Sequence, residues 1–322
     1  MPKIIRKLKV RVPHRISGFF EIVDEINGIK IENPEKIGSR GAGFNLNAFG
    51  TTEIIIEDLE KNDKNSCEIY INGKEFNEQA ETTHYIFNYY KKFIINPIKI
   101  KIFHNFDLPM GCGYGASGSG ALGIAFGLNS LLNLNLSYKE CGRIAHIAEV
   151  VNRTGLGTVC GILRGGLCVL KEPGYPCVSE RIPLPKNIKV VCGTFGMLST
   201  KSILTDPILN AKIKIAGRKA LEKLISNPNI KTFSKLSFEF MKNSNILNVL
   251  DLEEIKELLD NLNKLEIIGA SMNQLGRSIF AICKKSYLKS VIEILESYKP
   301  AINIYNLSIY KDKPIFFKNE KK

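Results

Sequence analysis

The chain has 322 residues, 44% of them hydrophobic and 24% charged, and a formal net charge of +13. This length leaves room for two domains, and the composition is ordinary for a soluble globular protein. The positive charge favours anionic partners, but it is scattered in ones and twos without the clustered basic stripe of a nucleic-acid-binding protein, so no nucleic-acid partner is expected.

The N-terminal third contains alternating strand patterns. Apolar and basic residues alternate over residues 4–12, which predicts a strand that ends at Pro13. Residues 33–47 (NPEKIGSRGAGFNLN) contain three glycines and predict a loop. Residues 51–59 and 68–76 predict a β-hairpin whose turn is Asn72-Gly73.

Residues 81–93 predict an amphipathic helix, and residues 97–106, where Ile alternates with Lys, predict a strand. That strand leads into LPMGCGYGASGSGALG at residues 108–123, which opens an apolar helix. A strand, a glycine-rich loop and a helix form a phosphate-binding arrangement, because glycines let backbone N–H groups approach an anion at the positive end of the helix dipole. Ser117 and Ser119 add hydroxyls that can reach phosphate or Mg²⁺.

The glycine-rich loop does not match two common nucleotide-binding motifs. A Walker A loop needs a lysine after the glycines, and a dinucleotide fingerprint needs an acidic residue about twenty positions on; neither is present. A flexible linker would not open an apolar helix. The sequence therefore predicts a nucleotide phosphate loop.

The second half repeats the mixture of strands and helices. Ser137 and Glu140 form a predicted capping box for a helix over residues 138–153, and the strand 165–171 follows. The pattern restarts with the strand 188–195, several helices, the strand 278–283 and a final helix and strand. We therefore predict an α/β protein of the α+β type, with a domain boundary near residue 185.

The eight cysteines lie far apart without a CxxC pair, and only four histidines are present. A structural zinc site and a disulfide framework are not expected. No apolar run is long enough to span a bilayer. We expect a reduced, cytoplasmic protein that does not associate with membranes.

The glycine-rich stretch resembles the second motif of the GHMP kinase superfamily, a proline followed by a glycine-rich loop at a helix start. The matching positions are Pro109, Gly111, Gly113, Gly115, Ala116, Ser117, Gly118 and Ser119, and the following Gly120 is included with them. The resemblance implies that these residues bind ATP, and that Mg²⁺ is held by Ser117, with Ser119 as a second candidate, and by Glu149. It also implies a ribosomal-protein-S5-like ATP-binding domain over residues 1–185 and a ferredoxin-like domain over residues 186–322.

Four further stretches resemble the archaeal pantoate kinases within that superfamily: residues 13–22, 37–46, 154–159 and 269–282. This resemblance implies an ATP-dependent kinase that phosphorylates the C4 hydroxyl of pantoate in coenzyme A biosynthesis. A homodimer is a further expectation. The chain departs from the superfamily pattern at Thr158, where many members have a catalytic Asp, and in the third motif, which keeps only Gly269 and Gly276.

Several polar residues are candidates for substrate binding. Arg40, between glycines, could clamp a carboxylate, and Arg153 ends a polar stripe that also contains Arg143, His146 and Glu149. The alternative for Arg40 is an ordinary surface arginine in a turn, and the alternative for the stripe is a solvent-exposed helix face. The remaining acceptor candidates are His14, Arg15 and Ser17, with Arg164 weaker, and Ser271 and Asn273 are candidates to border the phosphates.

Three other functions remain open. A kinase of the same superfamily could act on shikimate, homoserine or mevalonate. An S5-like domain of this charge could bind RNA. A protein with Thr158 in place of a carboxylate could bind nucleotide without catalysing transfer.

Overall fold

The structure is a computed structural model, and it describes residues 5–198 and 206–318. Two long strands, β1 (Ile5–Val23) and β4 (Gly38–Asp58), are central to the fold and pair antiparallel along their whole length. They belong to a sheet of order β14-β1-β4-β7-β5-β6, with β8 pairing with β4 and β9 with β8. Its other strands are β5 (Ser66–Ile71), β6 (Lys74–Glu75), β7 (Ile98–Phe106), β8 (Leu167–Leu170), β9 (Ser179–Arg181) and β14 (Phe316–Lys318).

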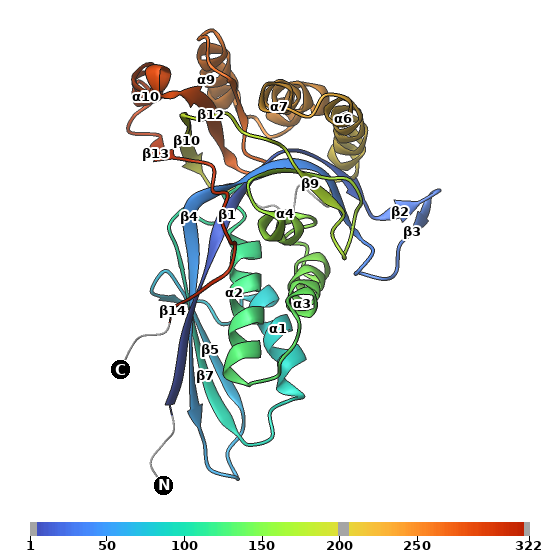
Figure 1. Ribbon diagram of the computed structural model, residues 1–322, viewed down its shortest axis with the longest axis vertical. Helices are drawn as coiled ribbons and strands as arrows, with labels where there is room; N and C mark the ends of the chain where they lie inside the picture. Colours follow the sequence, from blue (N-terminus) through green and yellow to red (C-terminus); the bar gives the residue numbers. More distant parts are fainter. Residues whose placement is uncertain (1–4, 199–205, 319–322) are drawn as a thin grey trace.

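Helices cover one face of this sheet (Figure 1). They are α1 (Glu81–Lys91), α2 (Ala116–Leu131), α3 (Tyr138–Val151) and α4 (Thr158–Arg164). Apolar residues of α2, among them Leu122 and Ala125, share one buried cluster with Val10 of β1 and Ile54 of β4. This packing fixes the start of α2 against the two long strands. A small hairpin, β2 (Glu25–Ile26) and β3 (Ile29–Lys30), joins β1 to β4.

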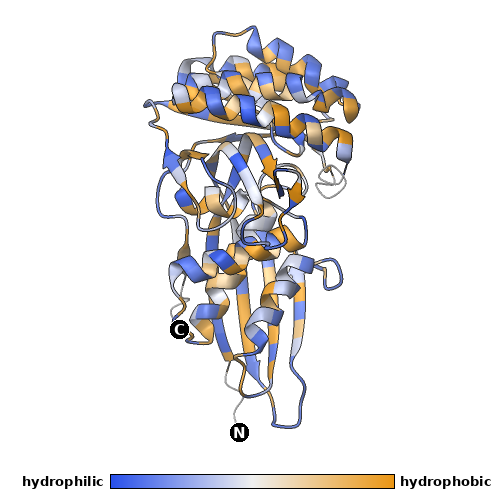
Figure 2. Ribbon diagram, turned by 90° about the vertical axis from the view of Figure 1, so that its right-hand side faces the viewer, coloured by the Kyte–Doolittle hydropathy of each residue, from blue (hydrophilic) through white to orange (hydrophobic). Residues whose placement is uncertain are grey.

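The C-terminal part has its own sheet, of order β11-β12-β10-β13. Its strands are β10 (Ile188–Gly196), β11 (Gly269–Met272), β12 (Arg277–Lys284) and β13 (Asn303–Leu307). The helices are α6 (Pro207–Ser226), α7 (Ile230–Ser244), α8 (Ile246–Val249), α9 (Glu253–Asn263), η1 (Lys285–Tyr287) and α10 (Leu288–Glu296). Figure 2 shows these helices as a layer across one end of the molecule, while the first sheet runs lengthwise below.

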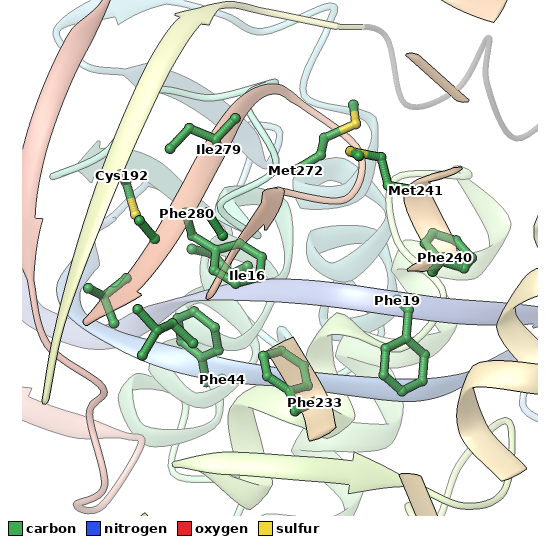
Figure 3. Close-up of a cluster of buried hydrophobic side chains, with 14 of the residues drawn as sticks. Ile16, Phe19, Phe44, Cys192, Phe233, Phe240, Met241, Met272, Ile279 and Phe280 are labelled. Atoms are coloured by element: carbon green, nitrogen blue, oxygen red, sulfur yellow. The ribbon is translucent and has the colours of Figure 1, made fainter. Parts of the chain in front are cut away.

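The long strands and the C-terminal part share a buried core (Figure 3). Phe44 of β4 makes edge-to-face contacts with Phe280 at 5.4 Å and with Phe233 at 5.9 Å between ring centroids. Phe19 of β1 lies 6.3 Å from Phe233. Burial of these aromatic rings holds the two parts of the fold together. It also holds β1 and β4 in place where they bend and pass from one part to the other (Figure 1).

Two predictions for the N-terminal strands are wrong. β1 does not end at Pro13 but continues to Val23, because a shift in register between Pro13 and Arg15 accommodates the missing N–H. Most of the predicted loop over residues 33–47 belongs to β4, which begins at Gly38. Its glycines serve close strand approach: a Cβ at Gly41, where φ is +151°, would lie 2.3 Å from the Phe19 carbonyl oxygen.

The predicted hairpin of residues 51–59 and 68–76 is also wrong in its partners. β7 lies between β4 and β5, and it pairs antiparallel with β4 and parallel with β5. Asn72-Gly73 is a turn, as predicted, but it joins β5 to the short β6. The helix 81–93, the strand 97–106 and the Ser137 capping box are confirmed.

The expectation of reduced cysteines is contradicted at one pair. Cys160 on α4 and Cys177 before β9 form a disulfide, with their Cα atoms 5.5 Å apart. The connection from β8 to the antiparallel β9 reverses the chain and brings Cys177 back to Cys160, which their sequence spacing alone does not reveal. The other six cysteines are free. Among the described residues, no helix combines the length and apolarity needed to cross a bilayer.

The predicted boundary at residue 185 stays a prediction. It falls between β9 and β10, but the end of the chain returns to the first sheet, where Phe317 pairs with Val10.

Candidate active site

A cavity of about 520 Å³ lies where the glycine-rich loop meets the bend of β1 and β4. One end is bounded by the residue after β6, the start of α1 and β7, with Phe76, Ala80, His104 and Phe106. The other end is largely apolar and is lined by Phe19, Phe20, Ala42, Leu156, Leu170, Leu198 and Leu275. The glycine-rich loop lies along the cavity between them and contributes Gly111, Gly113, Gly115, Ala116, Ser117 and Gly120.

The loop has the backbone that its sequence predicts. Gly111, Gly113 and Gly115 have φ values of +67°, +78° and +64°, a region that favours glycine. Space is also restricted, because a Cβ on Gly113 would lie 2.9 Å from Cβ of Asn273. α2 begins immediately after Gly115, which makes no side-chain capping hydrogen bond. Its first backbone N–H groups and dipole are therefore suited to an anion in the cavity.

The two serines of the loop have different surroundings. Ser117 lines the cavity, and its hydroxyl donates to the Thr154 carbonyl at 3.3 Å. Ser119 is fully buried, and its hydroxyl donates to the carbonyls of Pro13 at 2.9 Å and Gly115 at 3.2 Å. Ser117 is thus available to a ligand, whereas Ser119 ties α2 to β1.

Glu149 on α3 is 1% exposed and lies beside Ser117 and Gly118. Its Oε1 accepts a hydrogen bond from Thr154 Oγ1 at 3.2 Å, while its buried Oε2 has no hydrogen-bond partner among the described residues. Burial raises the pKa of Glu149 to about 7, and the neighbouring hydroxyls of Ser117 and Thr154 offset part of that rise. A carboxylate oxygen without a partner, next to a serine hydroxyl, fits a hard divalent cation such as Mg²⁺.

Thr158 starts α4 and also lines the cavity. Its Cγ2 methyl packs on the loop, since Cβ atoms at Gly115 and Gly118 would lie 2.9 and 2.7 Å from it. The residue therefore supports the start of α2 and brings a hydroxyl, not a carboxylate, to the site.

The N-terminal candidates divide into one that supports the loop and two that line the cavity. His14 is fully buried; its Nδ1 donates to the Tyr114 carbonyl at 3.0 Å and its Nε2 accepts from the Leu108 N–H at 3.4 Å. Burial lowers the pKa of His14 to about 4, so the ring is neutral and holds both ends of the loop. Arg15 and Ser17 line the cavity, and the Ser17 carbonyl accepts from the Gln274 N–H at 3.1 Å.

The other predicted arginines are placed differently. Ser39 and Gly41 line the cavity but Arg40 does not, and its guanidinium pairs with the carboxylate of Glu21 at 2.7 Å. Arg153 lines the cavity and is exposed, with φ +55° just after α3. Arg164 is exposed and does not line the cavity.

The rest of the polar stripe on α3 faces other parts of the protein. Arg143 pairs with Glu35 at 3.3 Å, and His146 Nε2 hydrogen-bonds the Ile37 carbonyl at 3.0 Å. Only Glu149 and Arg153 of the stripe adjoin the cavity or its loop.

In the third motif, Ser271 and Asn273 are fully buried, and several of their side-chain polar atoms have no hydrogen-bond partner among the described residues. Neither lines the cavity, although Asn273 packs beneath Gly113.

Two lining residues lack a signal in the sequence. Gln274 is 7% exposed, and its Oε1 is buried with no hydrogen-bond partner among the described residues. His104 hydrogen-bonds Thr52 Oγ1 at 2.9 Å and Thr83 Oγ1 at 3.1 Å, and burial lowers its pKa to about 4. Gln274 comes from a segment far from the loop in sequence, and His104, although it lies on β7 just before the loop, occupies an ordinary position in an alternating strand, so no spacing marks either residue.

Comparisons with known proteins agree with this geometry. Residues 80–166 match the model of the GHMP kinases N terminal domain. A pantoate kinase of Methanocaldococcus jannaschii is 35% identical over 91% of this chain and 98% of its own. A pantoate kinase of Thermococcus kodakarensis is 30% identical over 95% of this chain and 97% of its own.

Solved structures confirm the predicted α+β GHMP kinase fold. One described as a phosphotransferase related to the coenzyme A biosynthesis pathway superposes with a TM-score of 0.82 at 27% identity, covering 97% of this chain and 99% of its own. A homoserine kinase from Cytophaga hutchinsonii superposes with a TM-score of 0.69 at 16% identity, covering 97% of each chain, which supports the fold alone. Taken with the glycine-rich loop and the buried glutamate beside it, these matches establish that the chain belongs to the pantoate kinase family of the GHMP kinases.

Proposed function

We propose that this protein transfers the γ-phosphoryl group of ATP to the C4 hydroxyl of pantoate, giving 4-phosphopantoate for coenzyme A biosynthesis. The observation that carries the proposal is the near-complete match, over 98% of its length, to a relative named pantoate kinase. The site supports it, because one cavity combines a phosphate loop, a helix N-terminus and a mostly apolar end suited to the two methyl groups of pantoate.

We assign the triphosphate to the loop from Pro109 to Gly120 and the base to the end lined by Phe76, Ala80 and Phe106. Ser117 and Glu149 would hold Mg²⁺, which neutralises phosphate charge when bound. The orphaned Oε2 of Glu149 is the feature of the chain that supports this assignment.

The acceptor would lie along β1 and β4, next to Ser17 and the apolar end. Thr158 can hydrogen-bond the acceptor hydroxyl, but it cannot act as a carboxylate base. A loose phosphoryl-transfer transition state depends mainly on positioning and charge neutralisation, so transfer does not require such a base. The loop and the start of α4 would hold donor and acceptor in line.

The test is ADP release by the purified protein with ATP and Mg²⁺, using pantoate, shikimate, homoserine, mevalonate or no acceptor. We expect turnover with pantoate alone, with ³¹P NMR locating the new ester on C4. Turnover with another acceptor would refute the pantoate assignment but keep the kinase chemistry. ATP binding without turnover on any acceptor would refute the catalytic role.

A further inference from the structure

Arg15 occupies a buried position at the wall of the cavity. It lies on β1, is 3% exposed and lines the cavity together with Ser17 and Phe19. Its side chain runs beneath α4, where a Cβ on Gly161 would lie 2.0 Å from its Nε and 2.1 Å from its Cζ. The missing side chain at Gly161 thus provides the space that the guanidinium fills.

Among the described residues, no acidic group compensates the charge of Arg15. Its Nη1 donates to Asn45 Oδ1 at 3.3 Å, and Asn45 in turn donates from Nδ2 to the Ile162 carbonyl at 2.9 Å. Within the described part of the chain, no carboxylate lies within the 4.0 Å of an ion pair with Arg15. A buried cation with only a neutral partner is costly, and an anion that enters the cavity would relieve that cost.

Nearby arginines do not share this property. Arg40 and Arg218 both pair with the buried carboxylate of Glu21, at 2.7 and 3.0 Å. Arg153 lines the cavity but is exposed to solvent, where its charge is hydrated. Of these four arginines, only Arg15 is buried in the cavity wall without an ion pair to any described residue.

We propose that Arg15 is the anion receptor of the cavity. Its guanidinium binds an oxyanion of the reactants, either the carboxylate of the acceptor or the phosphoryl group in transfer. The identity of the acceptor rests on the function proposed above; the receptor role itself rests on the burial and missing ion pair of Arg15. Guanidinium groups bind either oxyanion through paired hydrogen bonds.

The test compares wild type with two variants. Arg15→Met keeps an unbranched side chain without the charge. Arg15→Lys keeps the charge without the planar guanidinium that can donate two parallel hydrogen bonds. Each is assayed with pantoate and with the primary amide of pantoate. If the receptor binds the carboxylate, Arg15→Met raises KM for pantoate more than 10-fold and leaves KM for the amide unchanged. If it binds the phosphoryl group, kcat falls about 100-fold for both acceptors. The KM and kcat of Arg15→Lys should lie between those of wild type and those of Arg15→Met.

A matched control is Arg11→Met on the same strand, where the guanidinium lies 4.2 Å from the Phe49 ring centroid and outside the cavity wall. This variant should keep both kinetic constants within about twofold. Kinetic constants for Arg15→Met within threefold of wild type on both acceptors would overturn the proposal.

A stability measurement separates the receptor from a structural arginine. Without ligand, Arg15→Met should melt at or above the wild-type temperature, because it removes an uncompensated buried charge. Sodium sulfate, compared with sodium chloride at equal ionic strength, should stabilise wild type more than Arg15→Met, because the general stabilisation by sulfate acts on both proteins and binding at Arg15 acts on wild type alone. Equal stabilisation of both would overturn the proposal, and this readout does not depend on whether pantoate is the acceptor.

Discussion

Arg40 on β4 donates two hydrogen bonds, 2.9 Å from Nε and 2.7 Å from Nη2, to one carboxylate oxygen of Glu21 on β1. The other oxygen of Glu21 accepts from Arg218 Nε on α6 at 3.0 Å. Glu21 is 1% exposed, and two arginines, one from each part of the fold, compensate its buried charge. Arg40 therefore has a structural partner that its position between glycines does not reveal.

Replacing Arg40 should affect stability more than substrate binding. Arg40→Met leaves the buried carboxylate of Glu21 with one partner, and we expect a loss of about 2 kcal/mol in the free energy of unfolding. KM for pantoate should change less than threefold. Urea unfolding and steady-state kinetics measure the two effects. A KM raised more than 10-fold at unchanged stability would instead support the carboxylate clamp that the sequence pattern predicts.

The two loop serines provide a matched pair. Ser117→Ala should lower kcat about 100-fold with little change in stability, because its hydroxyl faces the cavity. Ser119→Ala should reduce the free energy of unfolding by about 1–2 kcal/mol, since it removes buried hydrogen bonds to Pro13 and Gly115. The kcat of Ser119→Ala should stay within a few-fold of wild type. The reverse pattern would assign the metal contact to Ser119.

Gly155 tests the position of Glu149. A Cβ at Gly155 would lie 2.3 Å from Glu149 Oε2, whereas a Cβ at Gly118 would lie 3.1 Å from the same oxygen. Gly155→Ala should therefore displace the carboxylate and raise the Mg²⁺ concentration for half-maximal rate at least 10-fold. A Mg²⁺ titration of the rate at saturating ATP and pantoate measures this. An unchanged Mg²⁺ dependence would remove Glu149 from the metal site.

His14 makes folding sensitive to acid. Its pKa is about 4 in the folded protein and 6.5 ordinarily, so the unfolded chain binds more protons between these values. Stability is full above pH 6.5 and falls as the pH drops toward 4. The contribution lost between pH 7.5 and 5 is about 2 kcal/mol.

His14→Asn tests this assignment, because asparagine retains a donor but does not titrate in this range. Urea unfolding at pH 7.5 and at pH 5 should show a fall about 2 kcal/mol smaller in the variant than in wild type. His104, with a similar pKa, contributes equally in both proteins and cancels in the difference. Equal falls would mean that His14 is not held neutral in the fold.

The sequence alone determined the glycine-rich loop at the start of a helix and the fold class. The left-handed glycines at 111, 113 and 115, the start of α2 and the capping box at Ser137 are local: each depends on residues within a few positions. Such features follow from backbone sterics and short-range hydrogen bonds, so their spacing is sufficient to predict them. Strand ends were less predictable, because Pro13 and Gly41 take their conformation from pairing across β1 and β4.

Tertiary structure decided which polar residues reach the cavity. The sequence offers both Ser117 and Ser119 as hydroxyl ligands, with Ser117 first, but only the packing of α2 on Pro13 shows that Ser119 is buried. Arg15 and Arg40 are both arginines near glycines, yet Glu21 compensates one and nothing acidic among the described residues compensates the other. Burial and charge compensation depend on groups far apart along the chain, such as Arg218 beside Glu21, and no local pattern encodes them.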